Sequence, residues 1–142
     1  MKRLLGSIVG CAALAAGAQD LSGELATVHS MRCTFGPGTR TTWVAGHPHT
    51  VDVNLDKYIV FDSIDVAAGT ANELVDLRVD PARVFRSSFG LIVMDVRSTT
   101  FEMTTIFASP AKDGTFPAAN VRNLGDPVAS SEQYFGSCKL QS

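Results

Sequence analysis

The stretch GHPHTVDVNLD brings together residue types that often bind metal ions. His47 and His49 are separated by one residue, and positions i and i+2 of an extended segment point to the same side. Both imidazoles could therefore reach one ion, with Asp52 or His29 completing the set. Two histidines alone make an incomplete zinc site, and the proline between them favours an exposed turn. We therefore interpret GHPH as a polar turn with solvated histidines, and the metal site remains the alternative.

The acids that follow repeat part of a calcium-binding loop. Asp52, Asn54 and Asp56 occupy the spacing of the first three ligands of an EF-hand. Lys57 stands where that loop needs glycine, and Ser63 stands where it needs a bidentate glutamate. The residues between the acids are apolar, which is typical of a strand. We expect these side chains to form the solvated face of that strand.

Catalytic constellations are not evident in this sequence. Asp62 and Asp65 are three residues apart, which places them on opposite faces of a strand and prevents them from acting as an acid/base pair. The sequence has no G-x-S-x-G elbow, no H-E-x-x-H helix and no glycine-rich phosphate loop. We therefore predict a non-enzymatic protein without a cofactor.

Four aromatic residues are candidates for a ligand site. Trp43, Phe61, Phe101 and Phe107 lie in expected strands, and an up-and-down barrel can enclose a cavity lined by such side chains. We favour ordinary packing of these side chains in the core, because a domain of this size leaves little spare volume. The alternative is a site for a small apolar or amphipathic ligand.

The elements that must position these residues are strands throughout. From Thr50 to Phe61, the apolar residues fall mainly at odd positions, and their neighbours are mostly polar. This period of two predicts a strand with one solvated face. Residues 91–96 form an apolar run interrupted only by Asp95, which predicts a strand buried on both faces or deep in a barrel. The turn sequences GPG, AAGT and KDG separate such runs.

About eight short strands at regular spacing predict an all-β fold. We expect a small antiparallel up-and-down barrel of the lipocalin (calycin) type, with a β-sandwich as the alternative. No window shows sustained helical spacing with capping residues.

The N-terminus reads as a secretory signal. Lys2 and Arg3 precede a short apolar run, and Ala16-Gly17-Ala18 has the small-x-small pattern of a cleavage site. We therefore expect residues 1–18 to be a signal peptide, residues 19–30 an N-terminal arm and residues 31–142 a single β domain. Export to the periplasm or the medium of a bacterium follows from this. A lipoprotein anchored at Cys11 is the alternative.

Charge and hydropathy limit the partners of the mature chain. Removal of residues 1–18 leaves 10 basic residues against 14 acidic ones, a net charge of −4. Such a chain shows no electrostatic signature for nucleic acid or anionic lipid. No second apolar stretch is long enough to span a membrane. With export expected and nucleic acid excluded, the expected partners are a small molecule or an envelope protein.

Two cysteines remain in the mature chain. Cys33 and Cys138 lie near its two ends, and an even pair in an exported protein predicts a disulfide. Their wide spacing is unlike that of a redox pair, so we expect a structural bond.

Several segments resemble a family of small, secreted, uncharacterised bacterial proteins. The likeness covers roughly Met31 to Cys138 and is carried by MRCTFGPGTRTTW, VFDSIDVAAGTA, TTIFA and YFGSC. It implies a β-barrel-like fold with one terminal-to-terminal disulfide, and it implies no activity. Other members carry a histidine in the strand before the last loop, where this chain reads AANVRNL.

A second comparison is with periplasmic inhibitors of c-type lysozyme, which are also small disulfide-linked barrels. Their inhibitory loop has an S-G-x-x-Y pattern that this chain lacks. We therefore expect a binding or interaction module. The alternative is an inhibitor or partner-binding protein that acts through a loop of different sequence.

Overall fold

The computed structural model describes residues 23–125 and 128–142, without the side chains of residues 55–57. The expected signal peptide, residues 1–18, and Cys11 lie outside the described residues, as does the first part of the expected arm.

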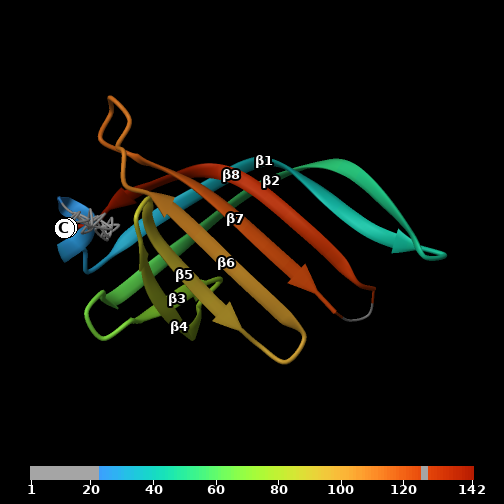
Figure 1. Ribbon diagram of the computed structural model, residues 1–142, viewed down its shortest axis with the longest axis horizontal. Helices are drawn as coiled ribbons and strands as arrows, with labels where there is room; N and C mark the ends of the chain where they lie inside the picture. The colour runs from blue at the N-terminus through green and yellow to red at the C-terminus, as the bar shows by residue number, and fades with distance from the viewer. Residues whose placement is uncertain (1–22, 126–127) are drawn as a thin grey trace, which may run out of the picture.

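Eight antiparallel strands form a closed barrel in which every strand pairs with its neighbours in the sequence, and the last pairs with the first (Figure 1). The prediction of an all-β up-and-down barrel is therefore confirmed. The strands are β1 Met31–Val44, β2 His47–Asp65, β3 Thr70–Val75, β4 Arg78–Ser87, β5 Gly90–Val96, β6 Thr100–Phe107, β7 Phe116–Leu124 and β8 Ser130–Leu140.

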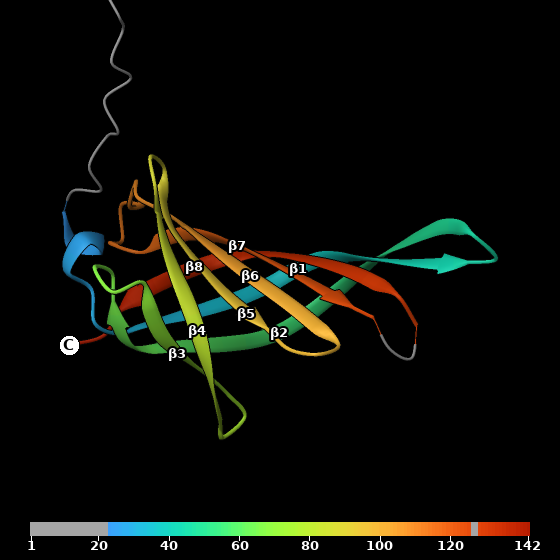
Figure 2. The same cartoon turned by 60° about the horizontal axis from the view of Figure 1, so that its bottom comes forward.

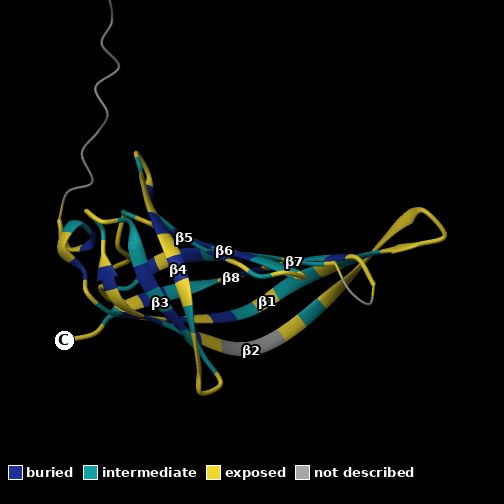
Figure 3. Cartoon of the chain, turned by 90° about the horizontal axis from the view of Figure 1, so that it is seen from below, coloured by how far each residue is buried: buried dark blue, intermediate teal, exposed yellow. Residues whose placement is uncertain are grey.

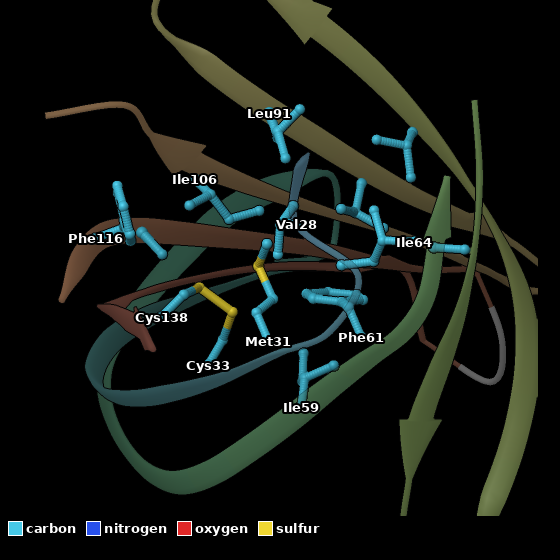
Figure 4. Packing of buried hydrophobic residues seen from close by; sticks show 14 of the residues in the cluster. Val28, Met31, Cys33, Ile59, Phe61, Ile64, Leu91, Ile106, Phe116 and Cys138 are labelled. Atoms are coloured by element: carbon cyan, nitrogen blue, oxygen red, sulfur yellow. A yellow bond between two sulfur atoms is a disulfide. The ribbon is translucent and has the colours of Figure 1, made fainter. Parts of the chain in front are cut away.

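The predicted disulfide is confirmed and closes the barrel. Cys33 on β1 lies directly opposite Cys138 on β8, and both side chains are fully buried. Figure 4 shows the bond among the apolar side chains that fill this end of the barrel, including Met31, Phe61 and Ile106. The core is therefore built around the junction of the first and last strands.

The described part of the expected N-terminal arm, residues 23–30, packs against the barrel. Residues Glu24–Thr27 form a 3-10 turn that lies across one end of the barrel (Figure 2). Leu25 and Val28 within this segment are buried and belong to the core. Two isolated apolar residues carry no periodic signal in the sequence, which is why the prediction placed this segment outside the β domain.

The hairpin of β1 and β2 projects beyond the opposite end of the barrel (Figures 1 and 2). Pairing of β2 with β3 begins only at Val60, so residues 47–59 of β2 pair with β1 alone. We call residues 38–53 the ribbon. Its turn consists of Ala45 and Gly46, both with positive φ, and β2 begins at His47. The prediction that GHPH is the turn was therefore wrong, because a two-residue turn is enough to join the strands.

The apolar run in β5 shows how the barrel sorts side chains. Leu91, Val93 and Asp95 point inward and are buried, whereas Ile92 and Met94 face outward and are partly exposed. The strand is therefore placed in the barrel wall rather than buried on both faces.

Candidate functional site

A row of charged residues crosses the barrel interior at the end nearer the ribbon. The row runs over β5, β6, β7, β8 and β1, and each of its residues lies directly opposite the next one on the neighbouring strand. In this order the residues are Asp95, Glu102, Arg122, Glu132 and Arg40. Three further residues lie beside this row on neighbouring segments. We call the complete set the charged belt: Arg40, Glu73, Asp80, Asp95, Arg97, Glu102, Arg122 and Glu132.

Four of the five carboxylates of the charged belt are deeply buried. Glu73 is 2% exposed, and Asp95, Glu102 and Glu132 are each 3% exposed. Burial of an ionised carboxylate is costly unless cations or hydrogen bonds compensate it. The arginines of the belt provide much of this compensation.

Arg97 lies just beyond the end of β5 and contacts three acids through one nitrogen. Its Nη2 lies 2.9 Å from Asp80 Oδ2 and 3.7 Å from Glu73 Oε1, and it also pairs with Asp95 Oδ2. Burial of Arg97 lowers its pKa, but the hydrogen bond and charge of Asp95 and the charges of the other two acids outweigh it. The net effect raises the pKa of Arg97, so this guanidinium remains charged.

Glu132 joins the ribbon to the barrel wall. Its Oε1 accepts a hydrogen bond of 2.6 Å from Arg40 Nε, and its Oε2 accepts one of 2.9 Å from the Tyr134 hydroxyl. The hydrogen bond and charge of Glu132 raise the pKa of Arg40. Burial and the same carboxylate raise the pKa of Tyr134. Arg40 therefore stays positively charged and the Tyr134 hydroxyl keeps its proton, so both groups can donate to Glu132.

A layer of uncharged polar groups separates the charged belt from the apolar core. Asn120 is buried and donates through Nδ2 to Glu102 Oε1 at 3.0 Å and to Thr104 Oγ1 at 2.9 Å. Tyr134 lies opposite Asn120 on the neighbouring strand. The interior therefore changes from the disulfide to apolar side chains, then to amide and hydroxyl groups, and finally to charges.

Three buried donor atoms in the charged belt have no hydrogen-bond partner in the described part of the chain. Arg97 Nη2 forms the ion pairs given above, whereas Arg97 Nε and Arg122 Nε have no acceptor within hydrogen-bond distance. Arg122 Nε lies 4.0 Å from Glu102 Oε2, which is within range of an ion pair but too far for a hydrogen bond. Buried polar atoms are almost always satisfied by protein, water or ligand. These donors could therefore bind the oxygen of a carboxylate, carbonyl or water.

The four aromatic candidates do not line a common cavity. Phe61 lies in the core and is fully buried. Phe101 and Phe107 alternate with buried residues of β6 and face outward, and Trp43 lies near the tip of the ribbon. Alternation along a strand identifies which residues share a face, but it does not say which face is inside. That is why the sequence could not separate these four residues.

The histidines lie on opposite ends of the molecule. His47 and His49 share one side of the ribbon and are exposed, whereas His29 precedes β1 at the end of the barrel that carries the 3-10 turn. Asp52 lies on the other side of the ribbon, because its position is one residue out of phase. No group of three potential metal-ligating side chains occurs among the residues that the structure describes.

The charged belt was not predicted, although the sequence carries part of the signal for it. Asp95 interrupts an otherwise apolar strand, and Glu102 lies between Phe101 and Met103. In a soluble barrel, the polar residue of such a pair is expected to face water. The structure places the carboxylates inside, where the arginines compensate them.

Within the described ranges, no helix has the length and apolar character needed to cross a membrane. Comparison with known proteins finds no matching family model, no matching curated protein and no matching solved structure.

Proposed function

We propose that the protein is an exported, non-enzymatic binding module that holds a small polar or amphipathic ligand at the charged end of its barrel. The observation that carries this proposal is that two buried donors of the charged belt, Arg97 Nε and Arg122 Nε, lack a hydrogen-bond partner. Preformed donors that lack an acceptor favour a ligand that brings its own, such as a carboxylate.

The apolar end of the barrel offers less to a ligand. Side chains from several strands and the 3-10 turn fill it around the disulfide (Figure 4). A purely apolar ligand would have to displace this core. A purely apolar ligand, which the sequence also allowed, therefore fits this barrel poorly. The proposed ligand must present polar groups to the charged belt.

Export is supported by the disulfide. Bonds of this kind persist in oxidising compartments and are rare in the cytosol of mesophiles. The buried position of Cys33 and Cys138 is typical of a structural bond. We propose that the protein acts in the periplasm or in the extracellular medium.

A thermal-shift titration tests the ligand proposal. Citrate, succinate and acetate are added to the purified protein, and an increase in melting temperature is expected for at least one of them. Arg122→Gln should abolish this increase. Arg32→Gln removes an exposed arginine from the outer surface and serves as the matched control. Equal increases in the melting temperature of the Arg122→Gln and Arg32→Gln variants would contradict the proposal. It would also be contradicted if the native protein showed no increase and native mass spectrometry found no co-purified molecule.

A protein partner bound by the ribbon is the second candidate function. Trp43 and Val44 are 48% and 63% exposed, and they lie next to the turn of a hairpin that projects from the barrel. Exposed tryptophan on a projecting element is typical of protein recognition. This candidate preserves the expectation of an inhibitor or partner-binding protein that acts through a loop.

Cross-linking in an envelope extract distinguishes this second candidate. A photoreactive group placed at residue 45, in the ribbon turn, should label a defined protein, and Trp43→Ala should abolish the labelling. Tyr58→Ala is the matched control, because Tyr58 is a similarly exposed aromatic residue on β2 outside the ribbon. Labelling that survives Trp43→Ala would argue against recognition by the ribbon.

A further inference from the structure

The outer surface of the barrel carries an apolar face over β4 to β8. On β4 to β7, the residues that alternate with buried ones are mostly apolar, and they lie on the outside. On β8, Phe135 is the apolar residue among the outward positions, and Ser131, Gln133, Ser137 and Lys139 are polar. Several of the apolar residues are large and strongly exposed. We call the following set the apolar outer face: Phe85, Ile92, Met94, Val96, Phe101, Met103, Phe107, Ala119, Val121 and Phe135.

The strand register makes this face continuous. One row of neighbours runs across the five strands through Phe85, Ile92, Thr105, Ala119 and Phe135. Rows on either side contain the remaining apolar residues. With strands about 4.8 Å apart and about 3.4 Å per residue, the face measures about 20 Å in each direction. Its area, on the order of 400 Å², is that of the largest apolar patches on soluble proteins, which are often functional.

The polarity of these strands is inverted relative to a soluble barrel. All four carboxylates in β4 to β8, which the structure describes completely, belong to the charged belt and point inward: Asp80, Asp95, Glu102 and Glu132. The outer face of these strands therefore carries apolar side chains and no carboxylate. A soluble antiparallel barrel would normally show the opposite arrangement.

Outside the ribbon, the outer surface of β1 and β2 is more polar. Outward residues of β1 and β2 include Arg32, Thr34, Tyr58 and Asp62. Figure 3 shows β5, β6 and β7 along one side of the flattened barrel and β2 along the other. The apolar outer face is thus confined to one side.

A hollow next to a single arginine lies at the edge of this face. It has a volume of about 490 Å³ and is lined by residues that include Arg83, Phe85, Met94 and Val96. Arg83 is exposed and forms no ion pair with any side chain that the structure describes. The hollow therefore combines mainly apolar walls, to which Thr70 and Asn72 add polar groups, with the positive charge of Arg83.

We propose that the apolar outer face docks onto a lipid bilayer that contains anionic headgroups. Aromatic and aliphatic side chains would enter the interfacial region of the bilayer, and Arg83 would contact a headgroup phosphate. The net charge of the chain argued against anionic lipid, but the carboxylates of these strands are enclosed in the barrel and do not face the bilayer.

Charge complementarity also argues against a second copy as the occupant. A two-fold contact through this face would bring the same patch of two chains together. Arg83 would then meet a surface that offers no carboxylate. A bilayer with anionic headgroups supplies the missing negative charge.

Vesicle flotation tests the proposal. The mature protein should float with vesicles of phosphatidylcholine and phosphatidylglycerol at a ratio of about 3:1. The double variant Phe107→Ser, Phe135→Ser should reduce the bound fraction by about tenfold. These side chains are 39% and 57% exposed, so their replacement should leave the fold intact. Tyr58→Ser, a similarly exposed aromatic residue on the polar side, is the matched control and should bind as the native protein does.

A second pair of variants tests the charge. Arg83→Gln should weaken binding to the mixed vesicles but not to vesicles of phosphatidylcholine alone, and Arg32→Gln should change neither. No flotation of the native protein, or equal loss in the Tyr58→Ser control, would overturn the proposal. So would a dimer in sedimentation velocity that Phe107→Ser, Phe135→Ser dissociates, because the face would then bind a second copy. Circular dichroism confirms that every variant is folded.

Discussion

At the scale of single residues, the barrel depends on how its buried carboxylates are compensated. Glu132 receives hydrogen bonds from Arg40 and Tyr134, and Glu102 receives one from Asn120. Networks of this kind stabilise a structure only when their members are satisfied, and removal of one partner leaves a charge buried without compensation. Each of these donors should therefore matter more than its exposure suggests.

Tyr134→Phe should reduce the free energy of unfolding at about pH 7 by about 1–3 kcal/mol. The change removes the hydroxyl that donates to Glu132 Oε2 without creating a large cavity. Urea denaturation followed by fluorescence measures the difference. Tyr58→Phe, at an exposed position, is the control and should be close to neutral.

The same variant should alter the dependence of stability on alkaline pH. Burial raises the pKa of Tyr134 above its ordinary value of 10.0. The folded state therefore holds this proton more tightly, and the free energy of unfolding falls as the pH rises beyond the ordinary value. Phenylalanine has no such proton, so Tyr134→Phe should show a shallower decline above about pH 10. An identical slope in the native protein and the variant would contradict this assignment.

At the scale of elements, the junction of β1 and β8 depends on close approach of the two backbones. The register of β1 shifts between Phe35 and Gly38, where the chain contains a bulge. Gly136 lies opposite Phe35, and a Cβ atom built on it would lie 1.9 Å from the carbonyl oxygen of Thr34. Glycine is required there because a neighbouring strand occupies the space of a side chain.

Gly136→Ala should therefore destabilise the barrel by more than about 2 kcal/mol, because the obstacle is backbone that cannot move aside freely. Gly36→Ala is the matched control within the same region. A Cβ on Gly36 has no atom within 4 Å, so this variant should stay within about 0.5 kcal/mol of the native protein. Thermal unfolding of both variants checks the prediction, and similar losses in the two would show that packing at this junction is not the cause.

At the scale of the whole molecule, the barrel has two chemically different ends. The disulfide, the apolar core and the 3-10 turn occupy one end, and the charged belt and the ribbon occupy the other. The apolar end contributes stability by burial. The charged end contributes stability only while its buried carboxylates keep their donors, and it is the end at which the proposed ligand would meet polar groups.

Leu25→Ala should destabilise the whole domain by about 2–5 kcal/mol, because Leu25 is only 1% exposed and packs into the core. Thr27→Ala alters an exposed residue of the same 3-10 turn and should be nearly neutral. Chemical denaturation of the two variants separates core packing from a local effect on the turn. A neutral Leu25→Ala would mean that the segment does not close the barrel in solution.

Local patterns in the sequence were sufficient to predict the fold. Period-two alternation identified the strands, the spacing of turn residues indicated an up-and-down order, and Cys33 and Cys138 indicated the bond that joins first and last strands. The strands and their order are predictable because each depends on neighbours in the chain, and the bond is predictable because the chain outside residues 1–18 holds a single pair of cysteines.

Only the tertiary structure decided which face of each strand lies inside. Alternation is unchanged when a strand is turned over, so the sequence could not show that Glu102 points inward and Phe101 outward. That choice depends on partners distant in the chain, such as Asn120, which donates to Glu102 from the next strand. The sequence by itself thus determined the barrel and its disulfide. The charged belt, the burial of Leu25 and the apolar outer face follow from long-range packing and charge compensation.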